Sequence, residues 1–145
     1  PDKTKYIVNV ANQFFSDRKI LLFSLETPKT LLKPNYNLQE SDNIIVIDML
    51  TKIEEIESYL AIEKPNYLLI DSIQLLKTDK EFLNAQDKIK YILDTLYNHI
   101  EEYNVNILVS DYLSEEETLD KYSSDTYSKC HQIWCIIDKV ITRLK

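Results

Sequence analysis

Hydrophobic and polar positions follow two alternating patterns along the chain. Short continuous apolar runs alternate with longer stretches in which apolar residues recur at helical spacing. Continuous apolar runs predict strands buried on both faces, and strands that alternate with helices are typical of a parallel sheet covered by helices on both faces. The sequence therefore predicts the α/β class. Strands are expected at 19–25, 43–47, 66–70, 105–109 and 139–144, and helices at 4–15, 51–63, 80–103 and 127–136.

Two segments lack a sustained period. Pro28 and Pro34 are expected to break the chain after the first strand, and the polar stretch 35–42 predicts a loop. Residues 111–129 carry acids, serines and tyrosines, and we expect an irregular excursion there. The pattern shows no internal repeat, and 145 residues are typical of one domain, which we predict over 1–145.

The most unusual feature of the composition is that glycine is absent. At an average of about 7% of residues, roughly ten glycines would be expected. Glycine supplies the positive φ angles that tight phosphate-binding loops need. An intact Gly-rich phosphate loop or G-x-G-x-x-G turn is therefore excluded.

Charge and cysteine content limit the partners and the compartment. The net charge of −7 disfavours DNA binding by bulk electrostatics, although a local basic loop could still bind phosphates. No apolar stretch is long enough to predict a membrane span. Two cysteines and an N-terminus without signal-peptide features predict a reducing compartment, by default the cytoplasm. The only methionine is Met49, so we expect further residues before Pro1 in the native protein.

Three predicted strands end in an acidic residue. Glu26 follows the first strand, Asp71 the third and Asp111 the fourth. The carboxyl ends of parallel strands form one edge of the sheet, where ligands of such folds usually bind. A row of carboxylates suits Mg²⁺, which takes a few carboxylates together with waters and substrate phosphates.

A family resemblance is carried by several of these segments. Residues 64–74, KPNYLLIDSIQ, resemble the Walker B segment of the RadA/Sms recombination ATPases and the corresponding strand in the C-terminal domain of DnaB-type replicative helicases. Both groups belong to the RecA-like P-loop ATPases. Residues 23–26 are similar to the strand that presents the catalytic glutamate, and 137–141 to a late strand. Lys3 and Thr4 resemble the end of a degenerate Walker A loop.

The resemblance implies a RecA-like core and roles for named residues. Lys3 would contact the β and γ phosphates of ATP, and Thr4 would bind Mg²⁺. Asp71 would hold the metal's water shell, and Glu26 would orient or deprotonate the attacking water. Asp111 stands where the family has a glutamine or histidine that senses the γ-phosphate or DNA. Because the chain begins where a Walker A loop should finish, we expect the first strand of the core to be missing.

Departures from the family pattern predict impaired or lost ATP hydrolysis. Asp2 replaces the glycine that precedes the Walker A lysine, which places a negative charge beside the phosphates and removes conformational freedom. Asp111 would repel the γ-phosphate. The acidic run 115–117 occupies the position of a DNA-contacting loop.

Simpler interpretations of these residues stay open. Lys3 and Thr4 could merely begin a helix, with Thr4 or the preceding aspartate as its cap. Asp71 could cap the turn that follows its strand, and Glu26 could be a solvated acid.

A zinc site is disfavoured. Cys130, His131 and Cys135 lack the fourth ligand and the spacing of a structural site, and the second histidine, His99, lies in the long predicted helix. Trp134 and the ten tyrosines could stack on bases, but without interleaved basic residues we expect core and half-buried positions.

Three functional hypotheses follow. The first is an ATPase core of a helicase or recombination protein, which hydrolyses ATP between the subunits of a homo-oligomer and acts on DNA. The second is a degenerate RecA-like domain that serves as a non-catalytic interaction module with replication, recombination or mobile-element proteins. The third is an unrelated Rossmann-like or flavodoxin-like regulatory domain. We expect a RecA-like domain with impaired hydrolysis.

Overall fold

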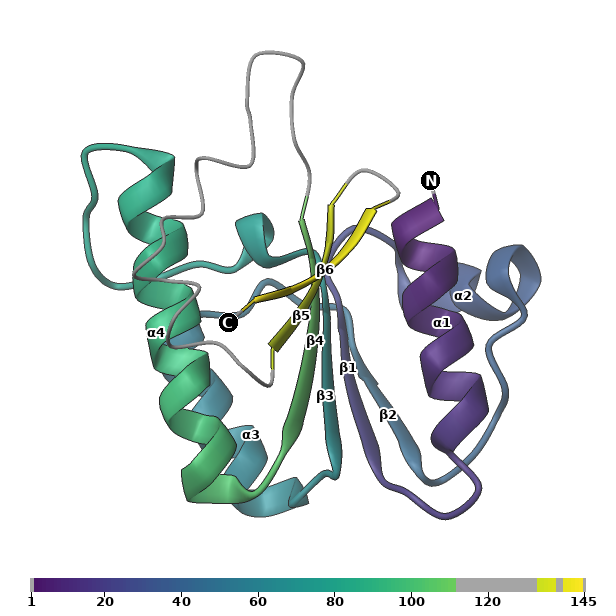
Figure 1. Ribbon diagram of the computed structural model, residues 1–145. Coiled ribbons are helices and arrows are strands. Elements are labelled where there is room, and N and C mark those ends of the chain that lie inside the picture. The colour runs from purple at the N-terminus through teal and green to yellow at the C-terminus, as the bar shows by residue number, and fades with distance from the viewer. Residues whose placement is uncertain (1, 112–132, 138–139, 145) are drawn as a thin grey trace.

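The computed structural model describes residues 2–111, 133–137 and 140–144, with side chains over 3–111 (Figure 1). Its elements in chain order are α1 (Asp2–Phe14), β1 (Ile20–Ser24), α2 (Lys29–Tyr36), β2 (Ile44–Ile47), α3 (Ile53–Glu63), β3 (Tyr67–Asp71), the 3₁₀ turn η1 (Ile73–Leu75), α4 (Ala85–Tyr103), β4 (Asn106–Asp111), β5 (Ile133–Ile137) and β6 (Val140–Leu144). No strand precedes α1 among these residues.

The strands form one sheet in the order β2-β1-β3-β4-β5-β6. All neighbours from β2 to β5 run parallel, and β6 is antiparallel to β5. Ser24 of β1 lies opposite Asp71 of β3, and Ile70 lies opposite Val109 of β4. This register brings the carboxyl ends of the three central strands to the same level. The predicted α/β class with a mainly parallel sheet is confirmed.

Helices cover both faces of the sheet. Figure 1 shows α1 and α2 on one side and α3 and α4 on the other. Alternate residues of β1 point to opposite sides, so that Ile20 and Leu22 join the core under α1 and α2, whereas Leu21 and Phe23 join the core under α3 and α4. Burial on both faces explains why this strand reads as a continuous apolar run.

The expected break after β1 is wrong, because α2 occupies residues 29–36. The helix begins directly after Pro28 and contains Pro34 near its end. Proline costs a helical hydrogen bond there, but Leu32 is fully buried, and Asn37 ends the helix in a left-handed conformation. Packing of one short apolar face thus outweighs the local signal of the prolines.

Three further expectations need correction. Strand β2 is an edge strand and only half buried, although its apolar run predicted full burial. Helix α4 begins at Ala85 and not at residue 80, because the Asn84 side chain caps it by accepting a hydrogen bond from the Asp87 amide. Residues 133–136 belong to strand β5 and not to a helix. Of the expected excursion, Asp111 is the last residue of β4, and 112–129 lie outside the described residues.

Candidate functional site

The first turn of α1 lies over the carboxyl edge of the sheet (Figure 1). Ile7, Val8 and Ala11 form the buried stripe that packs this helix on the sheet. Residues three and four positions apart share a helical face, so the same stripe carries Lys3 and Thr4 inward at the N-terminal end. Both polar side chains are buried.

Asp71, the last residue of β3, is the centre of the site and is 1% exposed. Its Oδ2 accepts a hydrogen bond of 2.6 Å from the Thr4 hydroxyl, and its Oδ1 accepts one of 2.6 Å from the Ser110 hydroxyl. The Lys3 Nζ lies 3.6 Å from Oδ1. The carboxylate is therefore bound on both oxygens by groups from α1 and β4.

Glu26 closes the other side of the cluster. Its Oε2 accepts a hydrogen bond from Lys3 in an ion pair, and its Oε1 accepts one of 3.1 Å from the Ser72 hydroxyl. The Glu26 amide donates to the Asp71 carbonyl at 3.2 Å, which ties the turn after β1 to the end of β3. The Glu26 side chain is 29% exposed, so this carboxylate faces solvent while Asp71 does not.

The donor set fits a nucleotide phosphate with Mg²⁺. A buried lysine beside two carboxylates can bind a phosphate oxygen as a point charge. A threonine hydroxyl and a carboxylate 2.6 Å apart offer the hard oxygen ligands that Mg²⁺ takes together with waters and phosphates. Over the described part of the chain, no group of three or more histidine, cysteine, aspartate or glutamate side chains could hold a metal ion.

The structure brings four of the five predicted site residues into contact. Lys3, Thr4, Glu26 and Asp71 form one hydrogen-bonded cluster although up to 67 positions separate them. Asp111 lies at the end of β4 and is fully buried. The prediction that acids at strand ends share one edge is confirmed for Glu26 and Asp71 by their common partner Lys3.

Other residues named from the sequence lie apart or outside the described region. Asp2 belongs to α1, and its side chain is not among those described. Cys130 and His131 fall outside the described residues, and Cys135 lies in β5. His99 lies in α4, buried among the residues that cover the opposite face of the sheet from α1.

Two site residues were missed by the sequence analysis. The hydroxyls of Ser72 and Ser110 donate to Glu26 and Asp71, respectively. Each serine is adjacent in sequence to an acid at a strand end, Asp71 or Asp111, and this pairing was the signal that could have found them.

Comparisons with known proteins agree on the fold. A solved structure of the ATPase domain of a DnaB-like helicase superimposes with a TM-score of 0.70 at 19% identity, over 92% of this chain and 64% of that chain. The chain thus spans less than two thirds of that domain's length. No protein-family model matches the sequence, and no curated protein matches it either. The chain has the α/β fold of a RecA-like ATPase core.

The described helices also bear on membranes. None of them is both long enough and apolar enough to cross a bilayer.

Proposed function

We propose that this domain binds ATP together with Mg²⁺ at the cluster of Lys3, Thr4, Glu26 and Asp71, and that its hydrolytic activity is impaired or lost. The observation that carries the proposal is the convergence of a buried lysine, a hydroxyl and two carboxylates at the carboxyl edge of the sheet. Ligands of open α/β sheets bind at this edge. The RecA-like fold supports the same site.

Each residue has a defined task in this proposal. Lys3 exchanges its carboxylate partners for the β and γ phosphate oxygens, and the Thr4 hydroxyl and Asp71 hold Mg²⁺ directly and through its waters. The metal supplies charge neutralisation at the phosphates. Glu26, the more exposed carboxylate, orients a water molecule and can accept its proton.

The charges of the site support impaired hydrolysis. Asp2 precedes Lys3 at the place where phosphates would approach, and Asp111 is fully buried at the end of the strand beside Asp71. Lys3 is paired with both Glu26 and Asp71. Anions around one lysine oppose the charge that develops at the γ-phosphate, and the interaction-module hypothesis follows if hydrolysis is lost completely. The resemblance to RadA and DnaB favours a cytoplasmic replication or recombination assembly and self-association.

Thermal unfolding with and without Mg²⁺–ATP tests the binding step. Saturation at 100 times Kd would stabilise the fold by about 2.7 kcal/mol, so the midpoint should rise. Asp71→Asn should abolish the rise, whereas Asp42→Ala, at an exposed acid on the β2 side, should retain it. Phosphate release should stay below roughly 1 s⁻¹, the low end of enzyme turnover. An unchanged wild-type midpoint at millimolar Mg²⁺–ATP would contradict the proposal.

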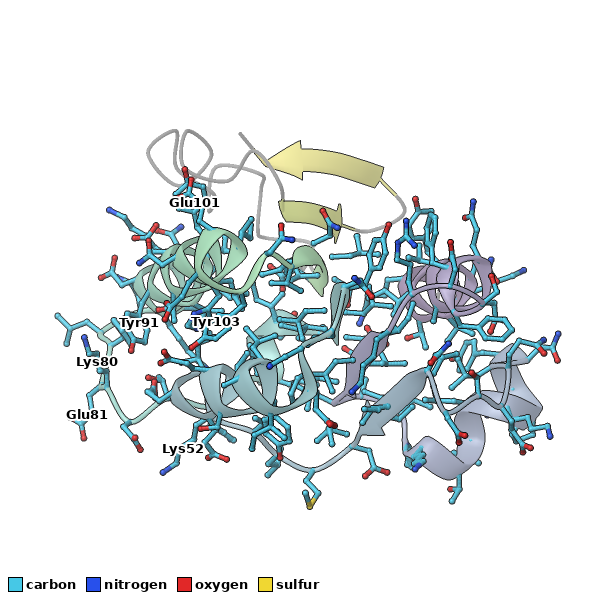
Figure 2. The ribbon with its side chains drawn as sticks, turned by 90° about the horizontal axis from the view of Figure 1, so that it is seen from below. Lys52, Lys80, Glu81, Tyr91, Glu101 and Tyr103 are labelled. Carbon is cyan, nitrogen blue, oxygen red and sulfur yellow. The ribbon has the colours of Figure 1, made fainter. Side chains whose placement is uncertain are left out.

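A hollow of about 460 Å³ beside the start of α4 favours DNA as a second ligand. Lys77, Lys80 and Lys88 line it, and Phe82 and the exposed Leu83 supply apolar surface. Burial lowers the pKa of Lys88, and the positive charge of Lys77 lowers it further, so an anion would relieve their repulsion. Figure 2 shows Lys80 beside Tyr91, and its Nζ lies 4.5 Å from that ring. This is the local basic surface that the net charge left open.

Fluorescence anisotropy with a labelled single-stranded oligonucleotide tests this second ligand. Replacement of Lys77, Lys80 and Lys88 by alanine should weaken binding and reduce its salt dependence. The matched control replaces three exposed lysines elsewhere, Lys5, Lys29 and Lys90, and changes the net charge equally. Equal loss in both triple variants would contradict a defined site at the hollow.

A further inference from the structure

Ser110 is placed to control the orientation of Asp71. It follows Val109, which pairs with Ile70 across the β3–β4 ladder, and it is fully buried. Its hydroxyl donates to the Asp71 Oδ1 at 2.6 Å and lies 3.5 Å from the Ile70 carbonyl. Strand β4 is hydrogen-bonded on both sides, to β3 and β5, so the serine is fixed by the sheet itself.

The other side-chain donors to Asp71 have different prospects. Thr4 donates to Oδ2 and Lys3 lies near Oδ1, but both come from α1 and both would turn to the ligand when nucleotide and Mg²⁺ bind. Of these three side chains around Asp71, Ser110 is the one without such a second task. It can keep one oxygen of the carboxylate fixed while the other faces the metal's water shell.

We propose that Ser110 is a positioning residue for the Mg²⁺ site, and that its hydroxyl sets the rotamer in which Asp71 holds the metal's waters. The inference rests on the proposed function, because it concerns the loaded state of that site. Groups that orient metal-binding residues typically change metal affinity about 10- to 100-fold when they are removed.

A merely structural role for the serine predicts something else. Loss of a buried hydroxyl would then lower the thermal stability of the chain without changing its metal dependence. Ser24 provides the matched control, because it is 2% exposed, ends β1 and donates to the Thr27 carbonyl, at 2.5 Å, and not to a carboxylate of the cluster.

The experiment measures the unfolding midpoint of the full chain at fixed ATP while MgCl₂ is titrated, with ATP and EDTA as the metal-free reference. Ser110→Ala should raise the Mg²⁺ concentration at half-maximal shift about tenfold and leave the shift with metal-free ATP unchanged. Ser24→Ala should lower the midpoint but keep the wild-type Mg²⁺ dependence. Ser110→Thr retains the hydroxyl and should restore the wild-type dependence even at a lower midpoint.

The outcomes separate the inference from the function on which it rests. A wild-type Mg²⁺ dependence in Ser110→Ala overturns the positioning role alone, as does an equal change in Ser24→Ala. The absence of any Mg²⁺–ATP shift in the wild-type chain overturns the proposed function and the inference together. If Ser110→Ala does not fold, failure of Ser110→Thr to match the wild-type Mg²⁺ dependence overturns the inference.

Discussion

Two buried polar groups, on opposite faces of the same sheet, are treated in opposite ways. At the carboxyl edge, Asp71 accepts two hydrogen bonds from hydroxyls and faces Lys3. In α4, His99 is also buried, at 6% exposure, but both of its ring nitrogens lack a hydrogen-bond partner among the described residues. An aromatic partner is Tyr103, whose ring meets the imidazole edge-on at 5.7 Å.

The difference shows which region is built to hold charge. Each ionised group of the site has an opposite charge or hydroxyl donors beside it, as buried charges require. Burial of His99 lowers its pKa against the opposing influence of Glu57 and Glu102, so the imidazole is kept neutral and packs as an apolar ring. The edge cluster is therefore the place for phosphate and metal chemistry.

Removal of the site's cation should have the largest effect. Lys3→Ala leaves two carboxylates facing each other without compensation. Breaking a buried ion pair costs up to 3–5 kcal/mol, and we expect about 3 kcal/mol because Glu26 is 29% exposed. Urea unfolding at pH 7 measures the loss. Lys5→Ala, at an exposed lysine of the same helix, should change the free energy of unfolding by less than about 0.5 kcal/mol. Equal values for the two variants would mean that the cluster is not held by charge.

Loss of one hydroxyl donor should have a smaller effect. Thr4→Val keeps the shape of the side chain but leaves the Asp71 Oδ2 without its 2.6 Å hydrogen bond. Hydrogen bonds to charged groups contribute about 1.5–3 kcal/mol, so we expect a loss in that range. Thr95→Val removes only a bond to the Tyr91 carbonyl within α4 and should be nearly neutral. A neutral Thr4→Val would weaken the view that both Asp71 oxygens need donors.

The sequence predicted the sheet well because burial on both faces leaves a strong local record. Strands β1, β3 and β4 lie within two residues of their expected bounds. Helix α2 was missed because Pro34 is a local signal against a helix, whereas the burial of Leu32 is a property of the tertiary fold. The strand β2 was expected to be buried on both faces because an apolar run does not reveal a position at the sheet edge.

The candidate site was predicted where chemistry and strand ends coincide. Glu26 and Asp71 are acids after apolar runs, and Lys3 and Thr4 were found through a family resemblance. Ser110 could not be assigned in the same way, since its role depends on β4 lying beside β3 and on the register of that pair. Strand order is a long-range property that the local pattern of one strand does not contain.

The smallest expected effect comes from the uncharged side of the comparison and depends on pH. The neutral state of His99 is favoured in the fold, whereas in the unfolded chain its pKa is about 6.5. As the pH falls below that value, the unfolded chain binds a proton that the folded chain resists, so stability is lost until the folded pKa is passed. His99→Phe keeps a ring against Tyr103 and should remove this acid-side loss while leaving stability above pH 7 nearly unchanged. Urea unfolding between pH 5 and 8 gives the difference between the two proteins, and His131, the other histidine, cancels because both contain it. Parallel pH profiles would show that His99 is as free to ionise in the fold as in the unfolded chain, and the contrast between the two buried regions would then not be one of charge.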